Sequence, residues 1–283
     1  MKPIPRRTLQ ELAQLLASKA RKDVLSGLAG EIVSHFQGNG LDFKELREYH
    51  LEDDARHVHW PSAMSPGPVA IKQFHDEYEL TDFIALDVSA SMTINLPKWN
   101  LATETTALLC AISMLCGDGA SLLRFSDHTE SFDRLPAGYR SLQTAARLLL
   151  TIPEHSSRTA ISPLCTCIRN ALRKPSRVFI ISDLIDDGYD AVLKNLAFHH
   201  DVTVCHVLSD ITTELPTNAS EIEDVETGER ISVNPDYLSQ AIALRQRFLD
   251  SARKSVRAAG AAYIHFSTDQ SPVETLKNAI KTI

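Results

Sequence analysis

Residues 81–92 read Thr-Asp-Phe-Ile-Ala-Leu-Asp-Val-Ser-Ala-Ser-Met, and this stretch decides the fold. The apolar run at 83–86 is short and unbroken, which is the pattern of a strand buried on both faces of a sheet. Asp87, Ser89 and Ser91 follow it at alternate positions. A carboxylate and two hydroxyls in one turn suit a hard cation such as magnesium, which prefers oxygen ligands. The alternative interpretation is a serine-rich turn that caps the following helix.

Strands and helices alternate along the chain on both sides of this stretch. Apolar runs predict further strands at 120–125, 177–181, 202–208 and 262–266. Periodic apolar positions predict helices at 97–116, 139–150, 163–173, 188–198, 236–259 and 271–283. This order predicts an α/β fold with a mainly parallel sheet and helices on both faces.

The segment before residue 81 differs from the rest in composition. We expect residues 1–80 to form an arm that packs on the main domain, with a helix at 8–35 and a strand at 69–79. Its charged cluster is interpreted as a network of ion pairs that fixes the arm, rather than as a catalytic group. The cluster comprises Asp53, Asp54, Arg56, His57 and His59.

The main domain is expected to span 81–283 and to carry one insertion. Residues 211–234 are polar, and Glu226-Thr227-Gly228-Glu229 has the composition of a turn between two short strands. A polar β-hairpin insertion is therefore predicted at about 211–234.

Composition narrows the class of protein and its partners. The chain has 283 residues and a net charge of −7, which argues against nucleic acid as a general partner. Its five cysteines follow no regular framework, as expected of reduced thiols in the cytosol. The N-terminus has no signal-peptide core, and no apolar run is long enough to span a membrane. We expect a soluble, cytoplasmic protein.

Three segments that are distant in sequence carry oxygen-bearing residues at or beyond strand ends. They are the Asp87 loop, a polar loop that contains Thr159, and Asp183, which follows the strand at 177–181. Because the carboxyl ends of parallel strands meet at one edge of the sheet, these residues should converge there. Their combination predicts a metal site more strongly than the Asp87 loop does alone.

The chain resembles a known family in these residues and in those that flank them. Asp87-x-Ser89-x-Ser91 with a later loop threonine and a strand-end aspartate is similar to the metal-ion-dependent adhesion site (MIDAS) of von Willebrand factor A domains. The flanking residues resemble the domain of unknown function 58 family, from about residue 30 to the C-terminus. They are Tyr49, residues 53–60, Lys72, Phe74, Glu77, residues 200–202, 214–216 and 226–229.

The resemblance implies a fold, a cofactor and a partner. It implies a Rossmann-like von Willebrand A domain that binds magnesium through Asp87, Ser89, Ser91, Thr159 and Asp183, with manganese or calcium as other ions for such a site. It also implies partnership with AAA+ ATPases of the MoxR type and with a protein client.

Some positions depart from the family pattern. Ser156-Ser157-Arg158 replaces a small glycine-rich turn, so Arg158 would bring a cation near the metal and either weaken metal binding or help to orient an acidic ligand. His59 stands where aspartate is usual, and Met64 where arginine is usual. The last two affect the ion pairing expected in the arm rather than the fold.

The donor set favours binding over catalysis. Two carboxylates and three neutral hydroxyls leave a magnesium ion electrophilic, so an open position can accept a carboxylate from a partner. The chain has neither a G-x-x-x-x-G-K-[ST] phosphate loop nor a G-x-S-x-G elbow. We expect a protein that is not an enzyme and that acts as an adaptor or co-chaperone.

Two alternatives remain open. One is a metal-dependent hydrolase of phosphatase type, although such enzymes usually need a second aspartate where this chain has Ser89. The other is a structural role with a vestigial site.

Overall fold

The structure is a computed structural model, and most of the residues that it describes lie between 82 and 280. The described residues are 14, 18, 19, 21, 22, 43–48, 70–74, 82–116, 118–151, 158–209, 221–223, 230–232 and 237–280. The chain divides into two compact units, one formed by Met1–Phe36 with Thr81–Ile283 and the other by Gln37–Leu80.

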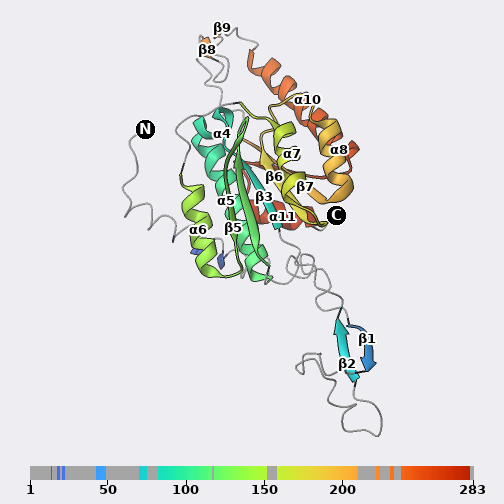
Figure 1. Cartoon of the computed structure of the whole chain (residues 1–283). Helices are drawn as coiled ribbons and strands as arrows, with labels where there is room; N and C mark the ends of the chain where they lie inside the picture. Colours follow the sequence, from blue (N-terminus) through green and yellow to red (C-terminus); the bar gives the residue numbers. More distant parts are fainter. Residues whose placement is uncertain are drawn as a thin grey trace. The chain divides into compact units, whose positions relative to one another are not determined.

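A six-stranded sheet forms the centre of the larger unit (Figure 1), with strand order β10-β7-β6-β3-β4-β5. Its strands are β3 (Asp82–Asp87), β4 (Ala120–Phe125), β5 (Thr129–Leu135), β6 (Arg177–Ser182), β7 (Asp201–Leu208) and β10 (Ala262–Ser267). All neighbours are parallel except β4 and β5, which are antiparallel. The predicted α/β class with a mainly parallel sheet is confirmed.

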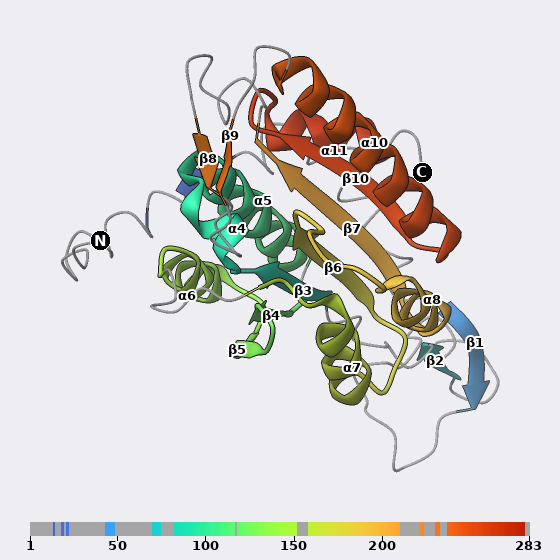
Figure 2. The ribbon, with the colours of Figure 1, turned by 90° about the horizontal axis from the view of Figure 1, so that it is seen from above.

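Helices cover both faces of this sheet, as predicted (Figure 2). One face packs against α5 (Leu96–Leu115), α6 (Tyr139–Leu149) and α11 (Pro272–Ile280). The other packs against α7 (Ile161–Ala171), α8 (Asp190–His199) and α10 (Tyr237–Ala258). Strand β3 supplies both cores because its side chains alternate: Ile84 and Leu86 face the first set of helices, and Phe83 and Ala85 face the second.

Two features of this unit differ from the sequence-based expectation. Strand β5 was not predicted, because its sequence Thr-Glu-Ser-Phe-Asp-Arg-Leu is largely polar, as befits an edge strand with several exposed residues. Helix α7 begins at Ile161 rather than at 163, so Pro163 lies in its first turn, where a proline disrupts no hydrogen bond.

The predicted hairpin appears as β8 (Glu221–Glu223) and β9 (Arg230–Ser232), which pair antiparallel. The described residues near the N-terminus are helical and contact the main domain. Lys19 forms a 2.8 Å ion pair with Glu104, and Ser18 Oγ lies 3.2 Å from the Tyr139 hydroxyl.

The smaller unit contains one pair of strands in its described part. Strand β2 (Ala70–Phe74) falls within the expected strand at 69–79 and pairs antiparallel with β1 (Phe43–Glu48). Strand β1 was not expected, because Phe-Lys-Glu-Leu-Arg-Glu is densely charged. The charged cluster at 53–59 and Met64 lie outside the described residues.

The strand order explains why the loops after β3 and β6 meet. From β3 the chain proceeds to β4 on one side, and it later returns to β6 on the other side of β3. Connections that leave in opposite directions open a crevice at the carboxyl ends of the strands, where ligands bind in open α/β sheets. Among the residues described, no helix is long and apolar enough to cross a membrane.

Candidate metal centre

Asp87 is the last residue of β3 and anchors the site. Its side chain is completely buried, and Oδ1 accepts a 2.9 Å hydrogen bond from the backbone N–H of Ser89. Ser89 is the N-cap of the short helix α4 (Ala90–Ile94), which lies beyond the end of β3 (Figure 1). The Ser89 side chain makes no capping hydrogen bond to this helix, so its hydroxyl is available to the site.

Thr159 joins the Asp87 loop from a distant part of the chain. Its Oγ1 donates to Asp87 Oδ2 at 3.0 Å and lies 3.0 Å from Ser89 Oγ, which in turn lies 3.1 Å from Ser91 Oγ. Thr159 is held there because the next backbone N–H, of Ala160, donates to the carbonyl of Ser126 at the end of β4. Four of the five predicted ligands therefore share one hydrogen-bonded cluster.

Asp183, the fifth predicted ligand, directly follows β6 and is also completely buried. Its Oδ2 accepts a 3.0 Å hydrogen bond from Lys98 Nζ. The next residue, Leu184, has a φ of 55°, and it is the single non-glycine residue with positive φ in the described part of the chain. This backbone conformation costs about 1 kcal/mol or more for a residue such as leucine. Strained conformations of this kind cluster at functional sites.

A buried histidine fixes the backbone of Asp183. His206 Nε2 lies 2.9 Å from the Asp183 carbonyl oxygen, and Nδ1 lies 2.7 Å from the Tyr263 hydroxyl. Because a carbonyl only accepts, Nε2 carries the proton and Nδ1 accepts from tyrosine. Burial is the main cause, and the neighbouring His265 a smaller one, of the lowering of the pKa of His206 to about 3, so the ring is neutral at pH 7.

Sequence reasoning missed Ser182. Its hydroxyl donates to Asp87 Oδ2 at 2.6 Å and accepts from the backbone N–H of Leu184 at 3.0 Å. The signal lay in the strand register: Leu86 of β3 pairs with Ile181 of β6, so the next residues, Asp87 and Ser182, are neighbours. Polar residues that end two adjacent parallel strands belong to one site.

Lys98 was also missed. Its side chain is 7% exposed and pairs with the fully buried carboxylate of Asp183. The sequence signal was a lysine in the first turn of a helix that has no acidic residue there, a position where the helix dipole disfavours a cation.

The electrostatics of the centre favour a bound cation. Burial, and to a smaller extent the charge of Asp183, raise the pKa of Asp87 to about 7. Within the described chain, no group of three or more His, Cys, Asp and Glu side chains is arranged to hold a metal ion. A cation at this rim would therefore rest on two carboxylates and on hydroxyls, which is an oxygen set that fits magnesium. Arg158 is exposed and directly precedes Thr159, and its ligand-orienting role stays a prediction.

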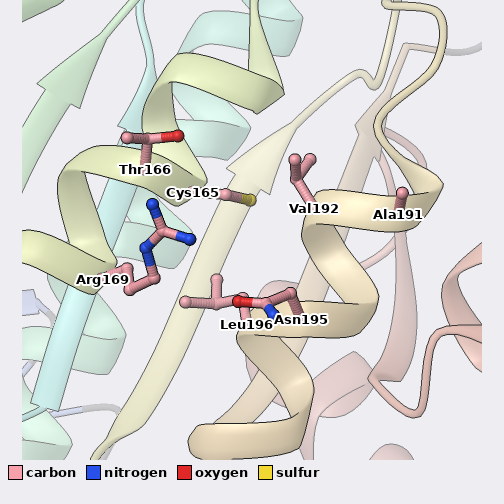
Figure 3. A pocket seen from close by; sticks show the side chains of 7 residues that line it. All are labelled: Cys165, Thr166, Arg169, Ala191, Val192, Asn195 and Leu196. Carbon is pink, nitrogen blue, oxygen red and sulfur yellow. The ribbon is translucent and has the colours of Figure 1, made fainter.

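A separate pocket of about 190 Å³ lies between α7 and α8 (Figure 3). It is lined by Cys165, Thr166, Arg169, Ala191, Val192, Asn195 and Leu196. Burial raises the pKa of the Cys165 thiol to about 12, so this cysteine is protonated at neutral pH and is a poor nucleophile. All five cysteines are free in the structure.

Comparisons with known proteins identify relatives of this chain. The family model "Protein of unknown function DUF58" matches residues 45–258, which is more than half of the chain. The uncharacterized protein Rv1480 of Mycobacterium tuberculosis is 28% identical over 265 residues, which cover 88% of this chain and 82% of that protein. The uncharacterized protein Mb1516 of Mycobacterium bovis matches with the same values.

The solved structures that match this chain share little sequence identity with it. An aerotolerance-related membrane protein from Bacteroides fragilis has a TM-score of 0.46 at 16% identity, covering 72% of this chain and 100% of that one. BatB from Bacteroides thetaiotaomicron has a TM-score of 0.42 at 16% identity, covering 72% and 98%. The SpRpn10 VWA domain has a TM-score of 0.37 at 13% identity, covering 70% and 94%.

Proposed function

This chain belongs to the DUF58 family, and from that premise we propose that it is a metal-dependent protein-binding module without catalytic activity of its own. The observation that carries the proposal is the hydrogen-bonded cluster of Asp87, Ser89, Ser91 and Thr159, with Asp183 beside it. Asp87 would hold magnesium or manganese together with the three hydroxyls, and Asp183 would complete the set directly or through water.

Such a centre supplies an electrophilic position for a partner's aspartate or glutamate. Neutral hydroxyls leave the ion's charge poorly compensated, and a carboxylate from another protein compensates it. The surroundings also suit protein docking. Ile94 and Leu96, on the segment after Ser91, are 61% and 57% exposed, and Ile185, two residues after Asp183, is 46% exposed. Exposed apolar residues beside a polar anchor are typical of binding surfaces.

The partner proposed is an AAA+ ATPase of the MoxR type in the cytoplasm, for which the chain would act as adaptor or co-chaperone toward a protein client. The family resemblance supports this assignment. The acidic anchor would come from the ATPase or from the client.

The test is affinity capture with magnesium or with EDTA. Wild-type protein should capture its partner only with magnesium, and Asp87→Ala should lose capture under both conditions. Asp201→Ala, which removes an exposed carboxylate at the opposite end of the sheet, is the matched control and should bind as wild type.

Capture that is unchanged by both EDTA and Asp87→Ala would contradict the proposal. Magnesium-dependent turnover of a generic phosphate ester that is lost in Asp87→Asn would favour the hydrolase alternative instead.

A further inference from the structure

Lys98 places an ammonium group inside the candidate metal centre. It is the third residue of α5, after the N-cap Asn95, whose side chain accepts from the Lys98 backbone N–H at 3.0 Å. Its ammonium lies 3.0 Å from Asp183 Oδ2, and the two side chains are 7% and 0% exposed. The cation therefore sits next to a carboxylate that the proposed function assigns to a divalent ion.

A contribution to stability alone does not explain why a lysine is buried at this position. Burying an ammonium costs several kcal/mol of solvation, and an ion pair that is buried often stabilises a fold no more than apolar residues of the same volume. The first turn of a helix adds a further cost, because the helix dipole is positive there. Lys98 nevertheless lies at the rim of the sheet, beside the cluster that would bind the ion, which suggests a role in that site.

The ammonium also has unused capacity. A lysine carries three N–H donors, and one is used by Asp183. For the other two, no acceptor meets Nζ among the residues that the structure describes. Because these N–H donors are largely shielded from water, a hydrogen bond to an additional anion would be favourable.

The formal charges show the consequence for a metal. With a metal bound, the carboxylates of Asp87 and Asp183 would carry two negative charges, and Lys98 would add one positive charge. A divalent cation would leave the centre with one excess positive charge, in surroundings where charge is poorly solvated. One carboxylate from a partner would restore neutrality.

We propose that Lys98 couples the metal to the partner, by weakening the binding of a divalent cation alone and thereby making a partner's carboxylate necessary for tight metal binding. The inference rests on the proposed function and adds to it a residue that makes metal and partner bind as a unit. By linkage, the metal and the carboxylate then raise each other's affinity by the same factor.

The experiment titrates the full chain with Mn²⁺ alone and with Mn²⁺ in the presence of acetate, the simplest carboxylate, by calorimetry. Lys98→Gln removes the charge and keeps an N–H donor. It should bind Mn²⁺ alone at least about tenfold tighter than wild type, a difference of about 1.4 kcal/mol. The gain in Mn²⁺ affinity from acetate should be smaller in Lys98→Gln than in wild type.

Two comparisons make the result specific. Lys194→Gln removes the same charge from an exposed position on α8 and should leave Mn²⁺ binding unchanged. Lys98→Arg retains the charge and should keep the weak affinity for Mn²⁺ alone. If Lys98→Gln unfolds too readily for calorimetry, the rise of its melting temperature with Mn²⁺ should exceed that of wild type, and Lys98→Met should behave in the same way.

The outcomes separate the inference from the function on which it rests. Equal Mn²⁺ affinity in wild type and Lys98→Gln, or weaker binding by the variant, would overturn the coupling role and leave the metal centre intact. No Mn²⁺ binding by any variant, with or without acetate, would overturn the metal centre and the coupling role together.

Discussion

At the scale of single residues, the candidate centre depends on buried groups whose surroundings set their protonation state. His206 is neutral because burial lowers its pKa and the neighbouring His265, Arg245 and Lys98 lower it as well, while its Nε2–H supports the Asp183 carbonyl. Asp87 is buried beside Asp183, which favours its protonated form when no cation is present. The two residues therefore give opposite dependences of stability on pH.

For His206, a folded pKa below the unfolded value means that stability is present above about pH 6.5 and is lost as pH falls. His206→Gln keeps an N–H donor and does not titrate. Between pH 7 and pH 5, the stability advantage of wild type over this variant should shrink by about 1–2 kcal/mol. Urea unfolding at both pH values measures it, with the exposed His199→Gln as control. A constant difference would contradict a buried neutral ring.

For Asp87, a folded pKa above the unfolded value means that the native state holds a proton between about pH 4 and pH 7. The metal-free protein therefore loses stability as pH rises through this window. Asp87→Asn should raise the free energy of unfolding by about 2 kcal/mol at pH 8 and by less at pH 5. Urea unfolding in EDTA tests this, and a variant that is less stable than wild type at pH 8 would contradict it.

At the scale of elements, the turn from α10 into β10 depends on one glycine. Gly260 has a φ of 87° and its N–H donates to the Arg257 carbonyl, while the N–H of Ala261 donates to Val256. A Cβ at Gly260 would lie 4.0 Å from that of Ala197, an ordinary contact, so the cost of a side chain is in the backbone.

Gly260→Ala should therefore lower the free energy of unfolding by about 1 kcal/mol, because alanine disfavours the left-handed region. Gly260→Asn should lose less, because asparagine tolerates this conformation. Denaturant unfolding of both variants gives the comparison. An equal loss in the two variants would point to crowding rather than to backbone conformation.

Predictability also differed between elements. Buried strands such as β3 and β6 were located from their unbroken apolar runs, because burial on both faces leaves no polar position. Strands β1 and β5 were missed, because charged or polar residues dominate both sequences. For β5, pairing with β4 and packing of Phe132 against Phe83 favour the strand more than its composition does.

At the scale of the whole molecule, one end of the sheet carries the candidate metal centre and the other carries an ion-pair network that stabilises the fold. At the end opposite the centre, Asp82 is buried and accepts from Arg177 Nε at 2.5 Å and from the Ser113 hydroxyl. Arg177 also pairs with Asp118 at 2.9 Å. Strand β3 separates Asp82 from Asp87 by five residue steps, roughly 17 Å.

Arg177→Met should therefore destabilise the protein without affecting metal binding. Removing one partner of a buried ion pair leaves the other charge uncompensated, and the loss should be about 3 kcal/mol. Mn²⁺ affinity under native conditions should equal that of wild type. Arg173→Met, at an exposed position nearby in sequence, is the control for both measurements. Weakened Mn²⁺ binding in folded Arg177→Met would contradict the separation.

The sequence by itself determined the α/β class, the positions of the buried strands and the five residues proposed to bind the metal. This is possible because apolar periodicity reports burial, and because parallel strands bring their carboxyl ends to one edge. Only the tertiary structure decided that Ser182 donates to Asp87 and that Lys98 pairs with Asp183. Those contacts join β3 to β6 and α5 to the loop after β6. A contact between side chains of different elements depends on how the elements pack, and the periodicity of a single sequence does not record it.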